Sequence, residues 1–159
     1  MTGHDVRPSF EEVYMEFARQ IARHPNVLVR VLEAGEAYGR GVSSRSSEVI
    51  HAGMYYEPGT LRAKLCVEGK WLLYDFLKKH NVAHNNCGKL IVATSDNELP
   101  TLEKIIRTGA ANGVDDLELL DARQAVALEP ELAVTGAILS PSTGMMDSAG
   151  LMLALLGEA

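Results

Sequence analysis

The sequence is short of the residues that mark several common classes of protein. Only two of its 159 residues are cysteines, Cys66 and Cys87, and their spacing matches no zinc site. We therefore expect two reduced, partly buried thiols and no metal centre. Acidic side chains outnumber basic ones by 21 to 15, and no run of Lys or Arg occurs. This balance argues against nucleic acid, and against an anionic membrane surface, as a partner.

Long apolar runs are also missing. No segment reaches the ~18 continuous apolar residues of a membrane span. Residues 1–8 lack the basic start and the apolar run of a signal peptide. We therefore expect a cytoplasmic protein with no transmembrane segment. Apolar residues nevertheless make up 47% of the chain and charged residues 23%, which is the composition of a globular domain with a buried core.

The amino-terminal part of the chain has a helix pattern followed by a strand pattern. Residues 9–23 carry apolar side chains at helical spacing behind a capping box of Ser9 and Glu12, which predicts an amphipathic helix. Residues 27–32 are nearly all aliphatic and predict a strand buried on both faces. A helix followed by such a strand is the second half of a βαβ unit. Glu33 ends this strand, at the position where dinucleotide-binding folds place an acid that binds the ribose.

The rest of the chain predicts a mixture of helices and short strands. A short helix is expected to begin among the serines of residues 43–47. Turns are expected at residues 58–59 and 141–144, strands at residues 90–93, 117–120 and 133–139, and helices at residues 60–80, 96–111, 121–128 and 149–156. Asp121 with Gln124 predicts a capping box, and Asp147 or Ser148 is expected to cap the last helix. The side chains of helix 60–80 expected to face inward are Leu61, Leu65, Leu72, Leu73, Phe76 and Leu77.

Several segments, in one order along the chain, resemble a known family. They are SSRSSEVIHAGMYY at residues 43–56, PGTLRA at 58–63, CGKLIVAT at 87–94, EP at 129–130, and PSTG at 141–144 followed by Asp147 and Ser148. Together they resemble the FAD-dependent oxidoreductases of the D-amino-acid-oxidase superfamily, and within it the L-2-hydroxyglutarate oxidase and dehydrogenase branch. The resemblance extends from about residue 27 to residue 157.

The resemblance implies an α/β (α+β) fold built from two domains. Residues 1–81 would form a partial Rossmann-like FAD-binding unit, residues 82–140 part of an inserted substrate domain with an antiparallel sheet, and residues 141–159 a helix that returns to the FAD-binding unit. The implied chemistry is oxidation of a small 2-hydroxy acid, of the L-2-hydroxyglutarate type, to the 2-oxo acid, with FAD as hydride acceptor. Because the superfamily also oxidises amines, an amino-acid or amine oxidase is an alternative, although residues 51–56 favour the hydroxy-acid branch.

The resemblance also implies site residues. His51 lies in the family motif and is the candidate catalytic base, because a neutral imidazole can accept the proton of a hydroxyl group; the alternative is that it orients a loop or packs beside the flavin. Lys89 is the candidate for attracting a dicarboxylic substrate, with an exposed strand lysine as the alternative. Tyr55 and Tyr56 are interpreted as packing residues. The residues implied to bind FAD are Glu33, Ser43, Ser44, Arg45, Ser46 and Ser47, and the alternative for the last five is a solvated loop.

One motif of the family is absent. A G-x-G-x-x-G loop normally brings the pyrophosphate to the first helix, about 20 residues before the acid that binds the ribose. No glycine occurs here between Gly3 and Gly35, and Glu11 and Glu12 place negative charge in that region. Side chains at these positions would keep the backbone away from a pyrophosphate. We therefore expect the chain alone to bind FAD weakly or not at all.

Two interpretations follow from this absence. The carboxyl-terminal part of the family's fold is also missing, and the apolar last helix suggests that the natural chain is longer. In the first interpretation the chain belongs to an FAD-dependent 2-hydroxy-acid oxidoreductase whose FAD site is incomplete or is completed by another segment. In the second it is a non-catalytic fragment that associates with itself or with a partner chain. The sequence leaves open whether the chain alone is an enzyme.

Overall fold

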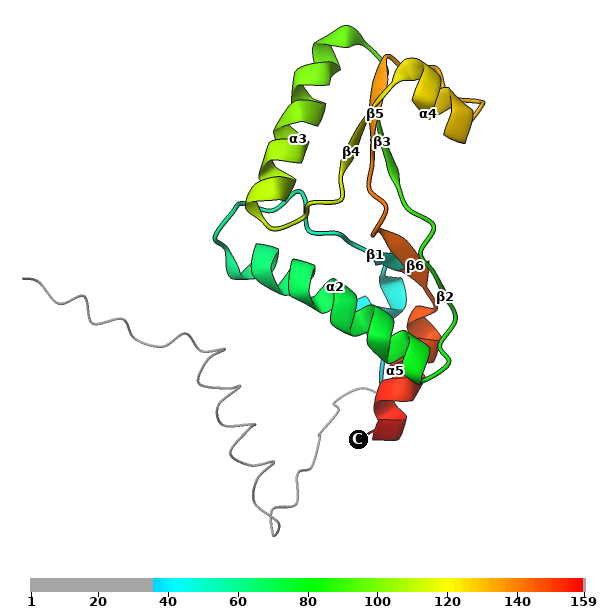
Figure 1. Cartoon of the computed structure of the whole chain (residues 1–159). Helices are drawn as coiled ribbons and strands as arrows, with labels where there is room; N and C mark the ends of the chain where they lie inside the picture. The colour runs from blue at the N-terminus through cyan, green and yellow to red at the C-terminus, as the bar shows by residue number, and fades with distance from the viewer. Residues whose placement is uncertain (1–35, 159) are drawn as a thin grey trace, which may run out of the picture. The chain divides into compact units, whose positions relative to one another are not determined.

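The computed structural model describes residues 36–158 (Figure 1). Of these, the residues from Gly39 onward form one compact unit. The helix expected over residues 9–23, the strand expected over residues 27–32 and Glu33 lie outside the described residues. The elements in chain order are η1 (Val42–Arg45), β1 (Val49–Ile50), α2 (Leu61–Lys79), β2 (His84–Asn85), β3 (Leu90–Ala93), η2 (Asp96–Glu98), α3 (Leu99–Ala111), β4 (Glu118–Asp121), α4 (Ala122–Leu128), β5 (Gly136–Leu139), β6 (Gly144–Met146) and α5 (Ser148–Glu158), where η denotes a 3-10 helix.

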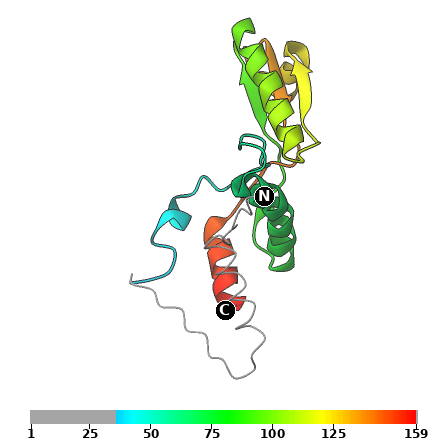
Figure 2. The same ribbon diagram turned by 90° about the vertical axis from the view of Figure 1, so that its left-hand side faces the viewer.

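The first of two small sheets contains β3, β5 and β4, with β5 in the middle and both pairings antiparallel. Leu139 of β5 lies opposite Leu90 on one side and Glu118 on the other. Helices α3 and α4 cover opposite faces of this sheet (Figures 1 and 2). The buried residues are Ala93, Leu102 and Ile138 on the α3 face, and Leu120, Ala125 and Ala137 on the α4 face. This arrangement confirms the mixed helix and antiparallel-sheet fold expected from the sequence.

The second sheet contains β1, β6 and β2, with β6 in the middle and both pairings antiparallel. Its strands come from distant parts of the chain, since Ile50 pairs with Gly144 and Asn85 with Met145. A core cluster of Ile50, Leu77 and Val82 joins this sheet to α2 and α5. None of these three short strands was expected from the sequence. The predicted domain boundaries at residues 81 and 140 stay a prediction.

The inward face of α2 differs from the expected one. Leu77 is fully buried and Leu73 and Phe76 are half-buried, as expected, but Leu61, Leu65 and Leu72 are exposed. The buried residues of the helix are Ala63, Lys70 and Leu77. These three are spaced by seven residues, which keeps them on one side of the helix. The prediction was wrong because apolar residues lie all around α2, so neighbouring elements decide which side is covered.

The helix ends follow the capping pattern of the sequence. Asp121 and Gln124 form the expected capping box at the start of α4. At α5, Asp147 Oδ1 accepts a hydrogen bond from Gly150 N at 2.9 Å, as expected for a cap, and Glu48 Oε1 accepts one from Ser148 Oγ at 2.8 Å. Glu48 therefore places a carboxylate at the positive end of α5, where the helix dipole stabilises it.

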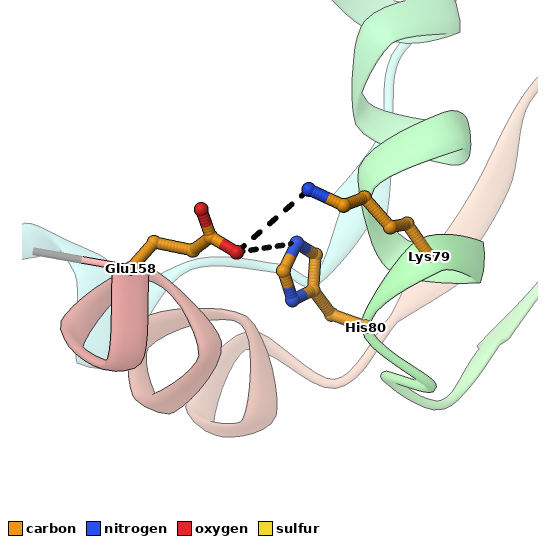
Figure 3. Close-up of polar contacts among 3 residues, drawn as sticks. All are labelled: Lys79, His80 and Glu158. Atoms are coloured by element: carbon orange, nitrogen blue, oxygen red, sulfur yellow. Dashed lines mark ion pairs between the residues drawn. The ribbon is translucent and has the colours of Figure 1, made fainter.

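The last turns of α2 and α5 also meet. Glu158 Oε1 lies 3.7 Å from Lys79 Nζ and 3.4 Å from His80 Nε2 (Figure 3). Because the Lys79 and Glu158 side chains are largely exposed, this ion pair contributes little to stability. Among the helices between residues 36 and 158, none combines the length and the apolar character needed to cross a lipid bilayer.

The two cysteines are both free. Cys66 is half-buried, as expected, whereas Cys87 is exposed. Burial raises the pKa of the Cys66 thiol, while the nearby charge of Lys70 lowers it by a smaller amount. Cys66 is therefore held mainly as the neutral thiol, so it is a poor nucleophile.

Two segments run side by side from one sheet to the other, residues 86–89 between β2 and β3 and residues 140–143 between β5 and β6. Ser140 N donates to Lys89 O at 2.9 Å, Lys89 N donates to Ser140 O at 3.2 Å, and Gly88 N donates to Thr143 O at 2.9 Å. Ser140, Ser142 and Thr143 are each at most 3% exposed. At Gly144, a Cβ atom would collide with the Asn85 carbonyl oxygen, so glycine is required where the second segment ends. We call this pair of segments the crossing connections.

Lys70 ties α2 to the crossing connections. It is only 4% exposed, and its Nζ donates to Ser142 Oγ at 2.6 Å. The backbone N of Ser142 donates to Asp116 Oδ2 at 2.9 Å. Burial lowers the pKa of Lys70, and the nearby acidic groups, Asp116 first, raise it by a smaller amount. The Lys70 side chain therefore holds the turn at Ser142 in place, while its burial costs free energy because the charged group loses water.

We expect Lys70→Met to be less stable than the unaltered chain at pH 7, by about 1–3 kcal/mol, because the variant leaves the buried Ser142 hydroxyl without its hydrogen-bond partner. The pKa of Lys70 in the folded chain lies below its ordinary value of 10.5. Between these two values the unfolded chain binds more protons, so the stability of the unaltered chain rises with pH there. The deficit of the variant should therefore grow towards pH 10.

Thermal unfolding followed by circular dichroism at pH 7 and pH 10 measures both effects. Lys64→Met is the matched control, because Lys64 is an exposed lysine of the same helix. A Lys70→Met variant that is at least as stable as the unaltered chain at both pH values would contradict the expectation.

Candidate functional site

The motif at residues 51–56 forms a loop that leaves the second sheet directly after β1. Met54 is buried in a cluster with Ala52 and Val114. Gly53 has a φ of +100°, and a Cβ atom there would lie 2.7 Å from Val67 Cγ2, so only glycine fits without strain. The sequence HAGMYY is thus shaped by packing against α2 and by the turn that ends α3.

Asn112, the residue that ends α3, clamps this loop. Its Nδ2 donates to Gly53 O at 3.0 Å and to Tyr56 O at 2.8 Å. These two carbonyls lie on either side of Tyr55 in the chain. The side chain of Tyr55 is 48% exposed, so a rigid backbone presents an accessible phenol. Nothing in the local sequence indicated this role of Asn112, because the contact joins residues 56 to 59 positions apart.

Lys89 lies in the crossing connections, one residue before β3, and its side chain reaches the loop. Lys89 Nζ donates to Tyr55 Oη at 3.0 Å and lies 4.9 Å from the centroid of the Tyr55 ring. Lys89 is half-buried, and its role in attracting substrate stays a prediction. Tyr55, interpreted from the sequence as a packing residue, is 48% exposed and is the partner of this lysine.

His51 completes the group. Partial burial lowers the pKa of the His51 imidazole, and the positive charge of Lys89 lowers it further. Both effects favour the neutral ring, which can accept a proton at neutral pH. Lys89 is therefore the residue that links this loop, since it contacts Tyr55 directly and its charge acts on His51.

The serine segment lies just before β1. Ser43, Ser44 and Arg45 belong to η1, Ser46 and Ser47 follow it, and all five are exposed. Arg45 Nη1 donates to Arg40 O at 2.8 Å and to Gly41 O at 3.0 Å.

The hydrogen bonds of this segment decide which groups could hold FAD. Ser44 Oγ donates to Gly41 O, and Ser46 Oγ accepts from Glu48 N, whereas Ser43 and Ser47 hydroxyls form no hydrogen bond within residues 36–158. These hydroxyls and the remaining N–H groups of Arg45 fit an anionic or ribityl group. Glu33 lies outside the described residues, so its part in such a site is a prediction.

A separate cavity of about 440 Å³ lies between the start of α2 and the end of α3. Thr60, Val67 and Asn112 are among its lining residues, and none of the expected site residues lines it. Within residues 36–158, no group of three His, Cys, Asp or Glu side chains is arranged as metal ligands. We call His51, Tyr55 and Lys89 the loop cluster, because Lys89 contacts Tyr55 and its charge lowers the pKa of His51.

Two relatives of the chain share the same name. L-2-hydroxyglutarate dehydrogenase, mitochondrial, from Arabidopsis thaliana is 42% identical over 131 residues, which are 82% of this chain and 27% of the relative. The protein of the same name from Nematostella vectensis is 44% identical over 134 residues, 84% of this chain and 29% of the relative. The chain thus spans less than a third of the length of these relatives.

A solved structure with FAD bound has a fold similar to that of this chain. L-α-glycerophosphate oxidase from Mycoplasma pneumoniae, with FAD bound, superposes with a TM-score of 0.63 at 28% identity, over 69% of this chain and 30% of that one. The model of the FAD dependent oxidoreductase family matches residues 17–159, which is most of the chain and includes the loop cluster. The chain therefore belongs to the FAD dependent oxidoreductase family.

Proposed function

We propose that this chain supplies part of an oxidoreductase that oxidises a small 2-hydroxy acid, of the L-2-hydroxyglutarate type, to the 2-oxo acid. The observation that carries the proposal is the loop cluster, in which Lys89 Nζ contacts Tyr55 and the charge of Lys89 lowers the pKa of the His51 imidazole. The names of the relatives support the choice of substrate class. FAD, when bound, accepts a hydride from the carbon that bears the hydroxyl group.

His51 has the role of the base in this proposal. The hydroxyl group of the substrate must lose a proton as its carbon is oxidised. A His51 nitrogen accepts that proton, which its lowered pKa allows because the imidazole is uncharged at neutral pH. Lys89 attracts the negatively charged substrate. The groups proposed to hold FAD are Glu33, Ser43, Ser44, Arg45, Ser46 and Ser47.

A second candidate function is association with another chain, without catalysis. Two observations favour it: no glycine is present between Gly3 and Gly35 to form the phosphate loop, and two helices expose large apolar side chains. The exposed residues are Leu61, Leu65, Trp71 and Leu72 on α2, and Leu153, Leu155 and Leu156 on α5. Exposed apolar side chains of this size are typical of surfaces that bind a partner. The partner in this candidate is a second copy or a complementary segment.

The location of the protein in the cell follows from the sequence only as an expectation. The cytoplasmic location expected from the sequence stays a prediction. The names of the relatives contain the word mitochondrial, which describes those proteins.

We expect the purified chain to lose added FAD during gel filtration, because no glycine-rich loop is available to approach the pyrophosphate. The measurement is the visible absorption spectrum of the protein peak, with the eluted mass recorded in the same run. Stoichiometric flavin bands in that peak would contradict the expectation and would favour an intact FAD site. A mass above that of one chain would favour the second candidate function.

The proposed activity is tested in a chimera. The segment of the Arabidopsis relative that aligns with this chain is replaced by the matching residues of this chain, and turnover of L-2-hydroxyglutarate is compared with turnover of a panel of amino acids. We expect L-2-hydroxyglutarate to be oxidised, and His51→Gln to lower kcat by about a hundredfold or more, because a general base is lost. His84→Gln, an exposed histidine of β2, is the control.

The pH profile of the chimera gives a second readout. Because the pKa of His51 lies below its ordinary value of 6.5, the activity should keep its plateau down to a pH below 6.5 and then fall as the imidazole becomes protonated. A chimera that retains FAD but oxidises only amino acids, or a His51→Gln variant with unchanged kcat, would refute the proposal.

A further inference from the structure

We infer that Tyr55 is a positioning residue, which holds the Lys89 ammonium group in place as the subsite for the second carboxylate of a dicarboxylic substrate. The inference rests on the proposed function for the identity of the substrate. It assigns a role to a residue that the sequence suggested was only packing, and it explains why a 2-hydroxy diacid would be preferred over a 2-hydroxy monoacid.

The contact between the two side chains fixes the lysine in two ways. The hydrogen bond from Lys89 Nζ to Tyr55 Oη is 3.0 Å long, and the same nitrogen lies 4.9 Å from the centroid of the ring. A lysine side chain has a flexible stem of four carbons and loses much conformational freedom when it binds a ligand. The tyrosine restricts that freedom before the substrate arrives, which is how preorganisation increases affinity.

Both partners are attached to rigid backbone. Tyr55 lies between Gly53 and Tyr56, whose carbonyls are both held by Asn112 Nδ2. Lys89 is held by the paired hydrogen bonds of its own N and O with Ser140, a residue that is fully buried. Because both backbones are held by hydrogen bonds, the two side chains keep their relative position more precisely than side chains on mobile loops would.

The charge of Lys89 has no acidic partner among the residues that the structure describes. The ion pairs within 4.0 Å in this part of the chain involve Lys79, His80 and Arg107. Tyr55 offers Lys89 a phenol hydroxyl and not a carboxylate, so no described residue forms an ion pair that would compete with an anion for this side chain. The exposed fraction of Tyr55, 48%, leaves the pair accessible to a solute.

His51 provides the second point of attachment for the substrate. The positive charge of Lys89 lowers the pKa of His51, which places the two side chains within electrostatic range of one another. A 2-hydroxy diacid presents its hydroxyl group and its far carboxylate at the two ends of one short chain. The hydroxyl group at His51 and the far carboxylate at Lys89 would then orient the substrate in one direction.

The first experiment measures the pKa of His51 in the full chain, without flavin or substrate, from the pH dependence of its Hε1 proton resonance. Lys89→Gln should raise this pKa, because the neighbouring positive charge is removed. Tyr55→Phe should also raise it, because the released ammonium group moves away, while the ring is retained for packing. Tyr56→Phe is the matched control and should leave it unchanged. An unchanged pKa in Tyr55→Phe would overturn the positioning role.

The second experiment titrates the same full-length chains with L-2-hydroxyglutarate and with L-2-hydroxyvalerate, which has the same carbon chain without the second carboxylate. The His51 resonance reports binding. Tyr55→Phe should weaken the binding of L-2-hydroxyglutarate by about fivefold, as expected for loss of a hydrogen bond to a charged group, and leave that of L-2-hydroxyvalerate unchanged. Tyr56→Phe should affect neither ligand.

The outcomes separate this inference from the proposed function. If the unaltered chain binds the two acids equally well, or if Tyr55→Phe weakens both equally, the carboxylate subsite is overturned, even where the chimera oxidises L-2-hydroxyglutarate. If the chimera is inactive while Tyr55→Phe selectively weakens the binding of the diacid, the proposed oxidation fails and the subsite is supported.

Discussion

The crossing connections are the constraint on which the described part of the chain depends. Ser140 and Lys89 exchange two backbone hydrogen bonds where the chain passes from one sheet to the other. The turn beside them has a buried polar interior, in which Lys70 and Asp116 reach Ser142 from α2 and from the loop before β4. Buried polar groups of this kind are stable only when each one is hydrogen-bonded. The same pairing fixes the backbone of Lys89, so the geometry of the candidate site follows from the way the two sheets are joined.

The sequence predicted well the features that depend on neighbouring residues. The strand Leu90–Ala93 has the expected bounds, and the capping box of Asp121 and Gln124 is present. The helix over residues 60–80 begins and ends within one residue of the expectation. Each of these is encoded by a local pattern, such as a run of aliphatic residues or a cap three residues before its partner.

Features that depend on distant contacts were not predicted. The strands β1, β2 and β6 are two or three residues long and exist because segments distant in the sequence pair with one another. The burial of Lys70 depends on Ser142, 72 residues away, and the contact of Tyr55 with Lys89 spans 34 residues. No periodicity within α2 or within the loop encodes these partners. His51 and Lys89 were found as candidates through the family resemblance, whereas Tyr55 required the structure.

The residues proposed to bind substrate and those proposed to bind FAD are held in different ways. The substrate side, the loop cluster, is built on backbone held by Asn112 and Ser140. The side proposed for FAD consists, in the described residues, of exposed side chains in and after a four-residue 3-10 helix. The chain belongs to the FAD dependent oxidoreductase family, and no glycine occurs between Gly3 and Gly35 to form the phosphate loop, so we expect weak retention of flavin by this chain alone.

The most direct test of the account is a nuclear Overhauser measurement on the full chain in solution, between the ring protons of Tyr55 and the ε-methylene protons of Lys89. The account predicts a clear cross-peak that persists without flavin or substrate, because the lysine nitrogen lies 4.9 Å from the centre of that ring. Absence of the cross-peak, with the Lys89 side chain averaging over several rotamers, would contradict the central claim that the fold itself assembles the site.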